Sequence, residues 1–234
     1  MLEVKDISVS YGVTPVLHGV SIDINANEMI AILGTNGAGK STLVNTILGM
    51  VKSSDGTITF EGQRIDKLPP HEIIHRGIAQ VPEARRIFPY LTVMDNLMVG
   101  AYNKNAWSIR KKNLERVFNL FPILKERKNQ TGGTLSGGEQ QMMVIGRGLM
   151  SNPKLLMVDE PSLGLAPKIL EVVYDILSKF RDEKITTILS EQNAGQALSI
   201  SDRGYIMENG RVILTDKSEN LLDNDKVKKA YLGI

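Results

Sequence analysis

Hydrophobic and polar positions alternate over the first part of the chain, and this alternation predicts β-structure. β-branched and other apolar residues cluster around turns that contain glycine or asparagine. The pattern predicts strands near residues 2–9, 17–24 and 28–33. The last strand contains Met29–Leu33, which is apolar throughout and is therefore typical of a strand buried inside a parallel sheet.

Later segments alternate between helical and strand-like spacing. Helices are predicted over three segments: Thr42–Met50, Pro69–Arg76 and Pro167–Arg181. Strands are predicted over three more: Thr57–Phe60, Leu155–Asp159 and Ile185–Leu189. A hairpin over Tyr205–Leu214 is predicted to turn at Asn209 and Gly210, because Asn-Gly favours the left-handed backbone of a short hairpin loop.

The middle of the chain is predicted to form a separate lobe of helices. Helical spacing dominates between about Ala84 and Met150, with Tyr102–Trp107 as a polar break. Strands and helices alternate on either side of this region, which favours an α/β fold with a mostly parallel sheet. A chain of 234 residues is expected to bury one sizeable core, so we expect one domain with a lobe inserted into it.

A glycine-rich loop joins the strand at 28–33 to the next helix and has the pattern G-x-x-x-x-G-K-S. The loop and the first turn of the helix consist of Gly34, Thr35, Asn36, Gly37, Ala38, Gly39, Lys40, Ser41 and Thr42. Glycines let successive backbone N–H groups point at phosphate oxygens, and Lys40 adds a positive charge at the β and γ phosphates. Ser41 offers a hydroxyl to Mg²⁺. An ordinary strand-ending turn is the alternative, and the strand–loop–helix context argues against it.

The segment Leu155–Glu160 ends an apolar strand in two carboxylates. Asp159 is expected to hold Mg²⁺, and Glu160 to polarise a water molecule that attacks the terminal phosphate. An apolar strand followed by two acids is also common as an exposed strand end. The phosphate loop makes the functional interpretation the stronger one.

Composition narrows the possible partners. Hydrophobic residues make up 42% and charged residues 23%, as in ordinary globular proteins. The net charge is only +2, so no bulk field favours nucleic acid. The absence of cysteine excludes disulfides and cysteine-based zinc sites and suits a reducing cytosol. We expect no signal peptide, and no apolar run approaches the roughly 20 residues that span a bilayer, so any membrane part must come from other chains.

A second sequence, Leu135–Gln141, begins with Leu-Ser-Gly-Gly-Glu and opens a helical pattern. Its Ser-Gly-Gly is expected to form another anion-binding helix start. The phosphate loop already wraps most of the phosphates and leaves only the outer face of the γ-phosphate open. A second copy could supply the other element.

With this Leu-Ser-Gly-Gly-Glu sequence, the chain resembles the ATP-binding subunits of ATP-binding cassette (ABC) transporters over essentially its whole length. The resemblance implies a P-loop NTPase (RecA-like) core, an N-terminal antiparallel β subdomain and an inserted α-helical subdomain. It implies a single domain over 1–234, with a nucleotide-binding core lobe of residues 1–84 and 152–234 and a helical lobe of residues 85–151.

The resemblance also implies a head-to-tail dimer that sandwiches ATP. Four residues of one subunit close over ATP held by the phosphate loop of the other: Ser136, Gly137, Gly138 and Glu139. Tyr11 matches the family's adenine-stacking aromatic residue. The alternative for Tyr11 is an ordinary packing residue on a strand.

Three positions depart from the usual pattern of this family. Glu83 stands where the family usually has the Gln of its Mg²⁺-sensing and membrane-subunit-sensing loop, and a carboxylate can still bind Mg²⁺. Gln192 stands where the family usually has the His that contacts the γ-phosphate. Its amide can donate the same hydrogen bond but cannot titrate near neutral pH. Ala166 stands where many members have Asp.

Several segments are similar to one of the two ATPase subunits of the branched-chain amino acid importers. They are Pro82–Pro89, Asp159–Pro167, Ser190–Ala194 and Ala230–Gly233. Importers of urea or amides share parts of this pattern, and a soluble ABC ATPase, for example one that serves iron–sulfur assembly, is a further alternative.

The resemblance implies several partners. They are a second ATPase subunit in a homo- or heterodimer, two integral membrane permease subunits and, indirectly, an extracytoplasmic solute-binding protein. It implies a peripheral location on the cytoplasmic face of the cell (inner) membrane. Apolar residues in Ile87–Val93 are candidates for a groove that receives a permease helix, with core packing as the alternative.

The sequence His71–His75 matches H-E-x-x-H, a zinc protease pattern. A catalytic zinc needs a third ligand and a longer helix, whereas Pro69-Pro70 and Gly77 confine this one to about two turns. The remaining histidine, His18, lies in a strand-like segment. A solvated helix face is therefore the better interpretation.

Overall fold

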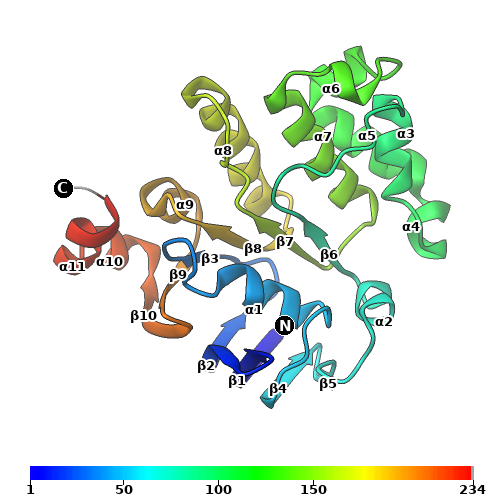
Figure 1. Cartoon of the computed structure of the whole chain (residues 1–234). Coiled ribbons are helices and arrows are strands. Elements are labelled where there is room, and N and C mark those ends of the chain that lie inside the picture. The colour runs from blue at the N-terminus through cyan, green and yellow to red at the C-terminus, as the bar shows by residue number, and fades with distance from the viewer. Residues whose placement is uncertain (233–234) are drawn as a thin grey trace.

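Two β-sheets with a helix between them form the body of the molecule in the computed structural model, which describes residues 1–232 (Figure 1). One sheet has six strands in the order β10-β9-β3-β8-β7-β6: β10 Arg211–Lys217, β9 Arg203–Glu208, β3 Met29–Leu33, β8 Thr186–Glu191, β7 Leu155–Asp159 and β6 Ile78–Val81. Its neighbouring strands are parallel except for β10 with β9, which confirms the mostly parallel sheet.

The second sheet is antiparallel and has four strands in the order β2-β1-β4-β5. Their bounds are Thr14–Ile24, Leu2–Tyr11, Asp55–Phe60 and Gln63–Arg64. This sheet is the N-terminal antiparallel subdomain that the resemblance implies. The helix α1, Lys40–Ile47, packs between the two sheets (Figure 1).

Strand β3 separates two hydrophobic cores. Ile30 and Ile32 face the core shared with α1 and the antiparallel sheet. Met29, Ala31 and Leu33 face the opposite core, which helices cover. Every residue of β3 is buried, as the apolar run predicts, because both faces of the strand are covered.

The remaining helices lie mostly on the outer side of the six-stranded sheet and in the inserted lobe. They are α2 Pro70–His75, α3 Val93–Val99, α4 Lys104–Ser108, α5 Arg110–Leu120, α6 Pro122–Glu126, α7 Gly137–Met150, α8 Pro167–Asp182, α9 Ala194–Ile200, α10 Ser218–Asp223 and α11 Asp225–Val227. A short 3₁₀ turn covers Gly132–Thr134, and a π-turn covers Lys228–Leu232. Among residues 1–232, no helix has both the length and the apolar character to cross a membrane.

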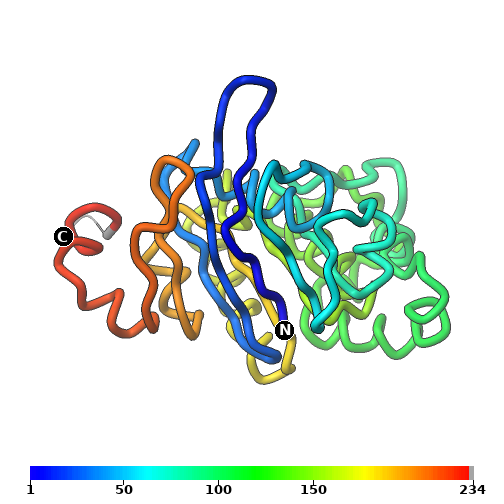
Figure 2. The backbone as a smooth tube through the Cα atoms, turned by 90° about the horizontal axis from the view of Figure 1, so that it is seen from below, coloured from blue at the N-terminus to red at the C-terminus, as the bar shows by residue number. Residues whose placement is uncertain are grey.

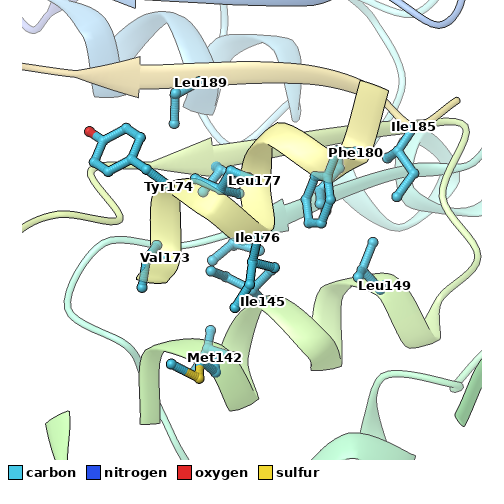
Figure 3. Packing of buried hydrophobic residues seen from close by; sticks show 14 of the residues in the cluster. Met142, Ile145, Leu149, Val173, Tyr174, Ile176, Leu177, Phe180, Ile185 and Leu189 are labelled. Carbon is cyan, nitrogen blue, oxygen red and sulfur yellow. The ribbon is translucent and has the colours of Figure 1, made fainter. Parts of the chain in front are cut away.

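Helices α7 and α8 pack against each other and against β8 through a dense apolar layer (Figure 3). Met142, Ile145 and Leu149 recur along one face of α7. Its partners are Val173, Ile176 and Phe180 from α8, Ile185 just before β8, and Leu189 within β8. This layer joins the inserted helices to the main sheet and fixes the direction in which α7 begins.

Several predicted elements are confirmed. The hairpin turns at Asn209 and Gly210, whose φ angles of 46° and 71° are left-handed as expected. Strand β7 has the predicted bounds, and α8 ends one residue beyond the prediction. The helix after the phosphate loop begins two residues earlier, at Lys40, and ends at Ile47 because Gly49 takes φ 71°.

One predicted feature is wrong. The stretch Tyr102–Trp107 is not a break throughout, since α4 begins within it at Lys104 and continues to Ser108. The Asn103 side chain accepts a hydrogen bond from the backbone N–H of Ala106 at 2.7 Å and caps this helix. Strand β6 and the helices from α9 onward were not anticipated. Gly233, which ends the Ala-Tyr-Leu-Gly segment, lies outside the described residues.

The turn between β9 and β10 fits closely against the phosphate loop. The backbone N–H of Gly210 donates to the carbonyl oxygen of Ala38 at 3.0 Å, and His18 N–H donates to the Gly210 carbonyl at 2.9 Å. A Cβ atom at Gly210 would lie 1.9 Å from the Val16 carbonyl oxygen. Glycine is therefore required twice over, by the φ angle and by the close approach of the backbone.

Candidate functional site

The phosphate loop has the compact shape that its glycines predict. A Cβ atom at Gly34 would lie 2.5 Å from the Met207 carbonyl oxygen, so no side chain fits there. Gly37 and Gly39 take φ angles of 82° and 102°, which other residues rarely adopt. The loop thereby turns its backbone sharply into the N-terminus of α1, where free N–H groups favour an anion.

Lys40 and Glu160 form a buried ion pair at this loop. The Lys40 Nζ atom lies 3.1 Å from Glu160 Oε1, and their side chains are 3% and 9% exposed. Lys40 Nζ also donates to the carbonyl oxygens of Gly34 at 2.8 Å and Thr35 at 3.3 Å. The sequence-predicted cation and the sequence-predicted base are therefore in direct contact.

Asp159 lies beside the same loop, at the carboxyl end of β7. Burial raises the pKa of its carboxyl, and the neighbouring hydroxyls of Ser190 and Ser41 lower it in part. Its Oδ1 atom is fully buried and has no hydrogen-bond partner among the described residues. An unpaired buried carboxylate oxygen beside a serine hydroxyl matches the oxygen ligands that Mg²⁺ prefers, so these residues fit the ion.

Glu83 and Gln192 both reach the phosphate loop. A pocket of about 180 Å³ is lined by Glu83, Glu160, Val16 and residues 36–42. The Gln192 side-chain amide donates a hydrogen bond to the Asn36 side-chain oxygen. The structure thus brings together the sequence-predicted residues at 34–42, 83, 159, 160 and 192.

The loop after Glu83 has an unusual backbone. Ala84, Arg85 and Arg86 have φ angles of 61°, 63° and 38°, so three consecutive residues other than glycine are left-handed. The Arg147 guanidinium donates to the Arg86 carbonyl oxygen at 2.8 Å and holds one end of this turn.

The Ser136–Glu139 turn lies apart from the phosphate loop of its own chain. Its residues do not line the 180 Å³ pocket. Ser136 caps α7, and its backbone N–H is bound by the Glu139 carboxylate at 2.8 Å in a reciprocal capping box. Glu139 also pairs with Arg127 at 3.0 Å, so its charge is used within the turn. Gly137 itself is partly exposed.

Tyr11 lies near the tip of the β1–β2 hairpin, which projects beyond the body of the molecule (Figure 2). The Tyr11 side chain is 50% exposed and does not line the pocket at the phosphate loop. Its ring is therefore free to stack on a planar group, and the structure does not bring it into the cluster around Lys40.

Three residues near the site were missed at the sequence level. Glu191 is a buried carboxylate at the end of β8, and Val16 lines the pocket. Arg85 packs against the Ser136–Glu139 turn, where a Cβ atom at Gly137 would lie 2.6 Å from its Nη1 atom. For Glu191 a signal existed, because an acid near the end of an apolar strand is similar to the pattern that indicated Asp159 and Glu160.

The H-E-x-x-H sequence lies on α2, which has six residues and is as short as predicted. His71 and His75 line a separate groove of about 640 Å³ together with apolar side chains from α3 and from the loop after Glu83. Phe88 lines this groove and is 45% exposed, whereas Val93 is fully buried. The segment Ile87–Val93 therefore contributes both to a surface groove and to the core.

The chain is similar in sequence to two ATP-binding proteins that are named for branched-chain amino acid transport. It is 47% identical to the high-affinity branched-chain amino acid transport ATP-binding protein BraG of Pseudomonas aeruginosa, and the match covers 100% of both chains. It is 37% identical to the probable branched-chain amino acid transport ATP-binding protein LivF of Archaeoglobus fulgidus, over 100% of this chain and 99% of the relative.

Solved structures share the fold. The ADP conformation of an ATP-binding cassette of an ABC transporter superposes with a TM-score of 0.83 at 30% identity, covering 100% of this chain and 99% of the other. The dimeric structure of a bacterial ABC transporter cassette gives a TM-score of 0.79 at 25% identity, covering 93% and 99%. A family model described as ABC transporter matches residues 17–163. The chain therefore belongs to the ABC transporter family.

Proposed function

We propose that this chain binds and hydrolyses ATP as the ATPase subunit of an importer for branched-chain amino acids. Membership of the ABC transporter family supports the ATPase activity. The full-length similarity to BraG and LivF supports the cargo class. The observation that carries the proposal is the joint placement of Lys40, Asp159 and Glu160 around one phosphate loop.

In this proposal the loop over 34–42 holds the phosphates of ATP. Backbone N–H groups and Lys40 neutralise the phosphate oxygens. Ser41, Asp159 and Glu83 would hold Mg²⁺, which supplies further positive charge to the phosphates when it is bound. The unpartnered Oδ1 atom of Asp159 supports this ligand set.

Glu160 acts as the general base, with Gln192 and Lys40 as the other catalytic side chains. The Lys40–Glu160 contact of 3.1 Å places the carboxylate at the phosphate-binding end of the lysine. A carboxylate there can accept a proton from a water molecule that attacks the γ-phosphate. Gln192 reaches Asn36 of the loop, so its amide can donate a hydrogen bond to the same phosphate.

A second subunit completes the site. We infer that Ser136, Gly137, Gly138 and Glu139 close over ATP held by another ATPase subunit, identical or paralogous. Their separation from the chain's own pocket supports this arrangement. Residues 85–151 form the lobe that carries this turn in the proposal, and residues 1–84 and 152–234 form the nucleotide-binding lobe. Tyr11 stacks on the adenine.

Two integral membrane permease subunits are the remaining direct partners, and a solute-binding protein acts through them. The apolar groove of about 640 Å³ is the proposed docking site for a permease helix, since its lining suits a helix with an apolar face. The chain is thereby held peripherally at the cytoplasmic face of the cell membrane. No nucleic acid is part of the proposal.

The proposal is tested with the complex captured from membranes through this chain and reconstituted in vesicles. ATPase activity is measured with the solute-binding protein loaded with leucine or, as a control, loaded with urea. Leucine should stimulate turnover, and recovery of two permease subunits should accompany the chain. If only the urea-loaded protein stimulated turnover, the cargo would be urea and not a branched-chain amino acid. A complex without membrane subunits would contradict a role in transport.

A further inference from the structure

Glu191 is a buried carboxylate that the proposed chemistry leaves unused. It is the last residue of β8, next to Gln192, and is 1% exposed. Strands β7 and β8 run parallel with Asp159 opposite Ser190. Glu191 therefore lies at the same edge of the sheet as Asp159 and Glu160, where the two strands lead into the loops of the site.

Three hydrogen bonds hold the Glu191 carboxylate, and they come from two separate segments. Its Oε1 atom accepts from the backbone N–H of Ser162 at 3.1 Å. Its Oε2 atom accepts from the Ser162 hydroxyl at 2.8 Å and from the backbone N–H of Gln192 at 3.0 Å. The carboxylate thus joins the loop after Glu160 to the segment that begins at Gln192.

A neutral side chain of the same shape cannot replace this arrangement. A carboxylate offers acceptors on both oxygens, whereas a glutamine offers one oxygen and one NH₂ group, which would face an N–H or O–H donor. Burial raises the pKa of Glu191, and the hydrogen bonds from Ser162 and from the Gln192 backbone lower it in part. None of the ion pairs within residues 1–232 includes Glu191, so hydrogen bonds from neutral groups hold it in place.

Both joined segments lead directly to functional atoms. Ser162 is two residues from Glu160, whose backbone is left-handed with φ 43° and whose N–H donates to the Ser190 carbonyl at 2.9 Å. Gln192 extends its amide to Asn36 in the phosphate loop. A change in the Glu191 hydrogen bonds therefore moves the base on one side and the amide on the other.

We infer that Glu191 is a positioning residue for ATP hydrolysis, which aligns Glu160 and Gln192 by tying Ser162 to the Gln192 backbone. This inference rests on the proposed function, because it assigns those two residues their catalytic roles. Glu191 itself touches neither substrate nor metal. Its effect should appear in the rate of the chemical step and leave nucleotide binding unchanged.

The test measures kcat and KM for ATP in the captured complex that carries Glu191→Gln. We expect kcat to fall about 10- to 100-fold, as when a buried hydrogen bond to a charged group is lost. KM should stay within about threefold, since a transition-state interaction is lost and not ground-state binding. Glu115→Gln, at an exposed position on α5, is the matched control and should leave both constants unchanged.

A double variant separates positioning from general loss of stability. If Glu191 acts through Gln192, combining Glu191→Gln with Gln192→Ala should slow turnover by less than the product of the two single effects. Effects that multiply would overturn the inference. So would a Glu191→Gln protein in which ATP affinity and melting temperature fall together with kcat.

Ser162→Ala keeps the inference testable if Glu191→Gln fails to fold. It removes one of the three hydrogen bonds, so we expect kcat to fall about fivefold at unchanged KM. An unchanged kcat would overturn the inference. Glu160→Gln is measured in parallel: if it hydrolyses ATP normally, the proposed function fails, whereas inactive Glu160→Gln with fully active Glu191→Gln refutes only the role of Glu191.

Discussion

At the scale of single residues, the contact between Lys40 and Glu160 restricts the positions of both side chains. Their buried contact of 3.1 Å keeps the base close to the cation that the phosphates need. A buried charge is tolerated when it is paired, and each side chain here supplies the other's partner. The pair therefore keeps both charges of the proposed chemistry together inside the site.

Glu160→Gln should separate binding from hydrolysis. The amide keeps the shape of the side chain but cannot accept the proton, so we expect turnover to fall by about 10² to 10⁴. Nucleotide affinity should change little, because Lys40 and the loop backbone remain. Steady-state ATPase assays and binding of a fluorescent nucleotide check both expectations, with Glu171→Gln on the exposed side of α8 as the control. Normal turnover in Glu160→Gln would exclude it as the base.

Residues whose chemistry depends on neighbours in sequence could be predicted, and those that depend on neighbours in space could not. The loop over 34–42 and the two acids at the end of β7 follow from local patterns. Glu83 and Gln192 were located only through the family resemblance, since neither has a local signature. Arg85 was missed because its contact with the Ser136–Glu139 turn spans about fifty residues of chain.

At the scale of secondary-structure elements, Gly138 determines how closely helices α7 and α8 approach each other. A Cβ atom at Gly138 would lie 2.2 Å from Ile169 Cγ2. The Cγ2 methyl group is bonded directly to Cβ, and Ile has one strongly preferred χ1 rotamer in a helix. It therefore cannot move away without shifting α8. The glycine therefore permits the close packing that the apolar layer in Figure 3 continues further along both helices.

Gly138→Ala should destabilise the protein more than Gly137→Ala. Overpacking typically costs about 1 to 3 kcal/mol, and the helical preference of alanine returns up to about 1 kcal/mol. We expect a net loss of about 1 to 2 kcal/mol for Gly138→Ala. At Gly137 the added methyl would meet the flexible end of Arg85, so we expect a change of at most about 0.5 kcal/mol. Urea unfolding of both variants is the measurement, and equal stabilities would contradict this account.

Elements with strong apolar periodicity or clear turn residues were predictable. Strand β7, helix α8 and the β9–β10 turn illustrate this. Strand β6 has four residues, too few for an alternation to stand out, and it becomes a strand by pairing with β7. Helix α4 depends on a single side-chain cap in a polar segment, so apolar spacing gives no sign of it.

At the scale of the whole molecule, the phosphate loop and the Ser136–Glu139 turn belong to different parts of the fold. The Ser136–Glu139 turn does not line the pocket of its own phosphate loop. The layer of α7 and α8 side chains fixes the turn where it is. In the proposed dimer, the phosphate loop and the Ser136–Glu139 turn of one chain would therefore belong to two different ATP sites.

We therefore expect ATP to join two chains, with the phosphate loop of one facing the Ser136–Glu139 turn of the other. In the Glu160→Gln background, where ATP persists, we expect Mg·ATP to double the measured mass of the ATPase, either alone or with its co-expressed paralogue. Light scattering after gel filtration is the measurement. Ser136→Phe in the same background should prevent this association, because the ring blocks the turn that must approach the phosphate. Unchanged mass at saturating Mg·ATP, with the native partner present, would contradict a shared site.

The fold class and the presence of two sheets were accessible from the sequence, but the order of strands was not. Local patterns do not reveal that β3 pairs with β8 on one side and β9 on the other. These partners lie more than 150 residues away along the chain. Such pairings depend on how whole layers pack, which no short segment encodes.

The contact between Gly210 and Ala38 has a consequence for how the protein is made. The phosphate loop lies near the start of the chain, whereas its contact Gly210 and the strands β8 and β9, which flank β3, are synthesised more than 150 residues later. Domains fold as units during synthesis, and long-range pairings form late. We therefore expect the loop to reach its final conformation only after these later segments have been synthesised and have paired with β3.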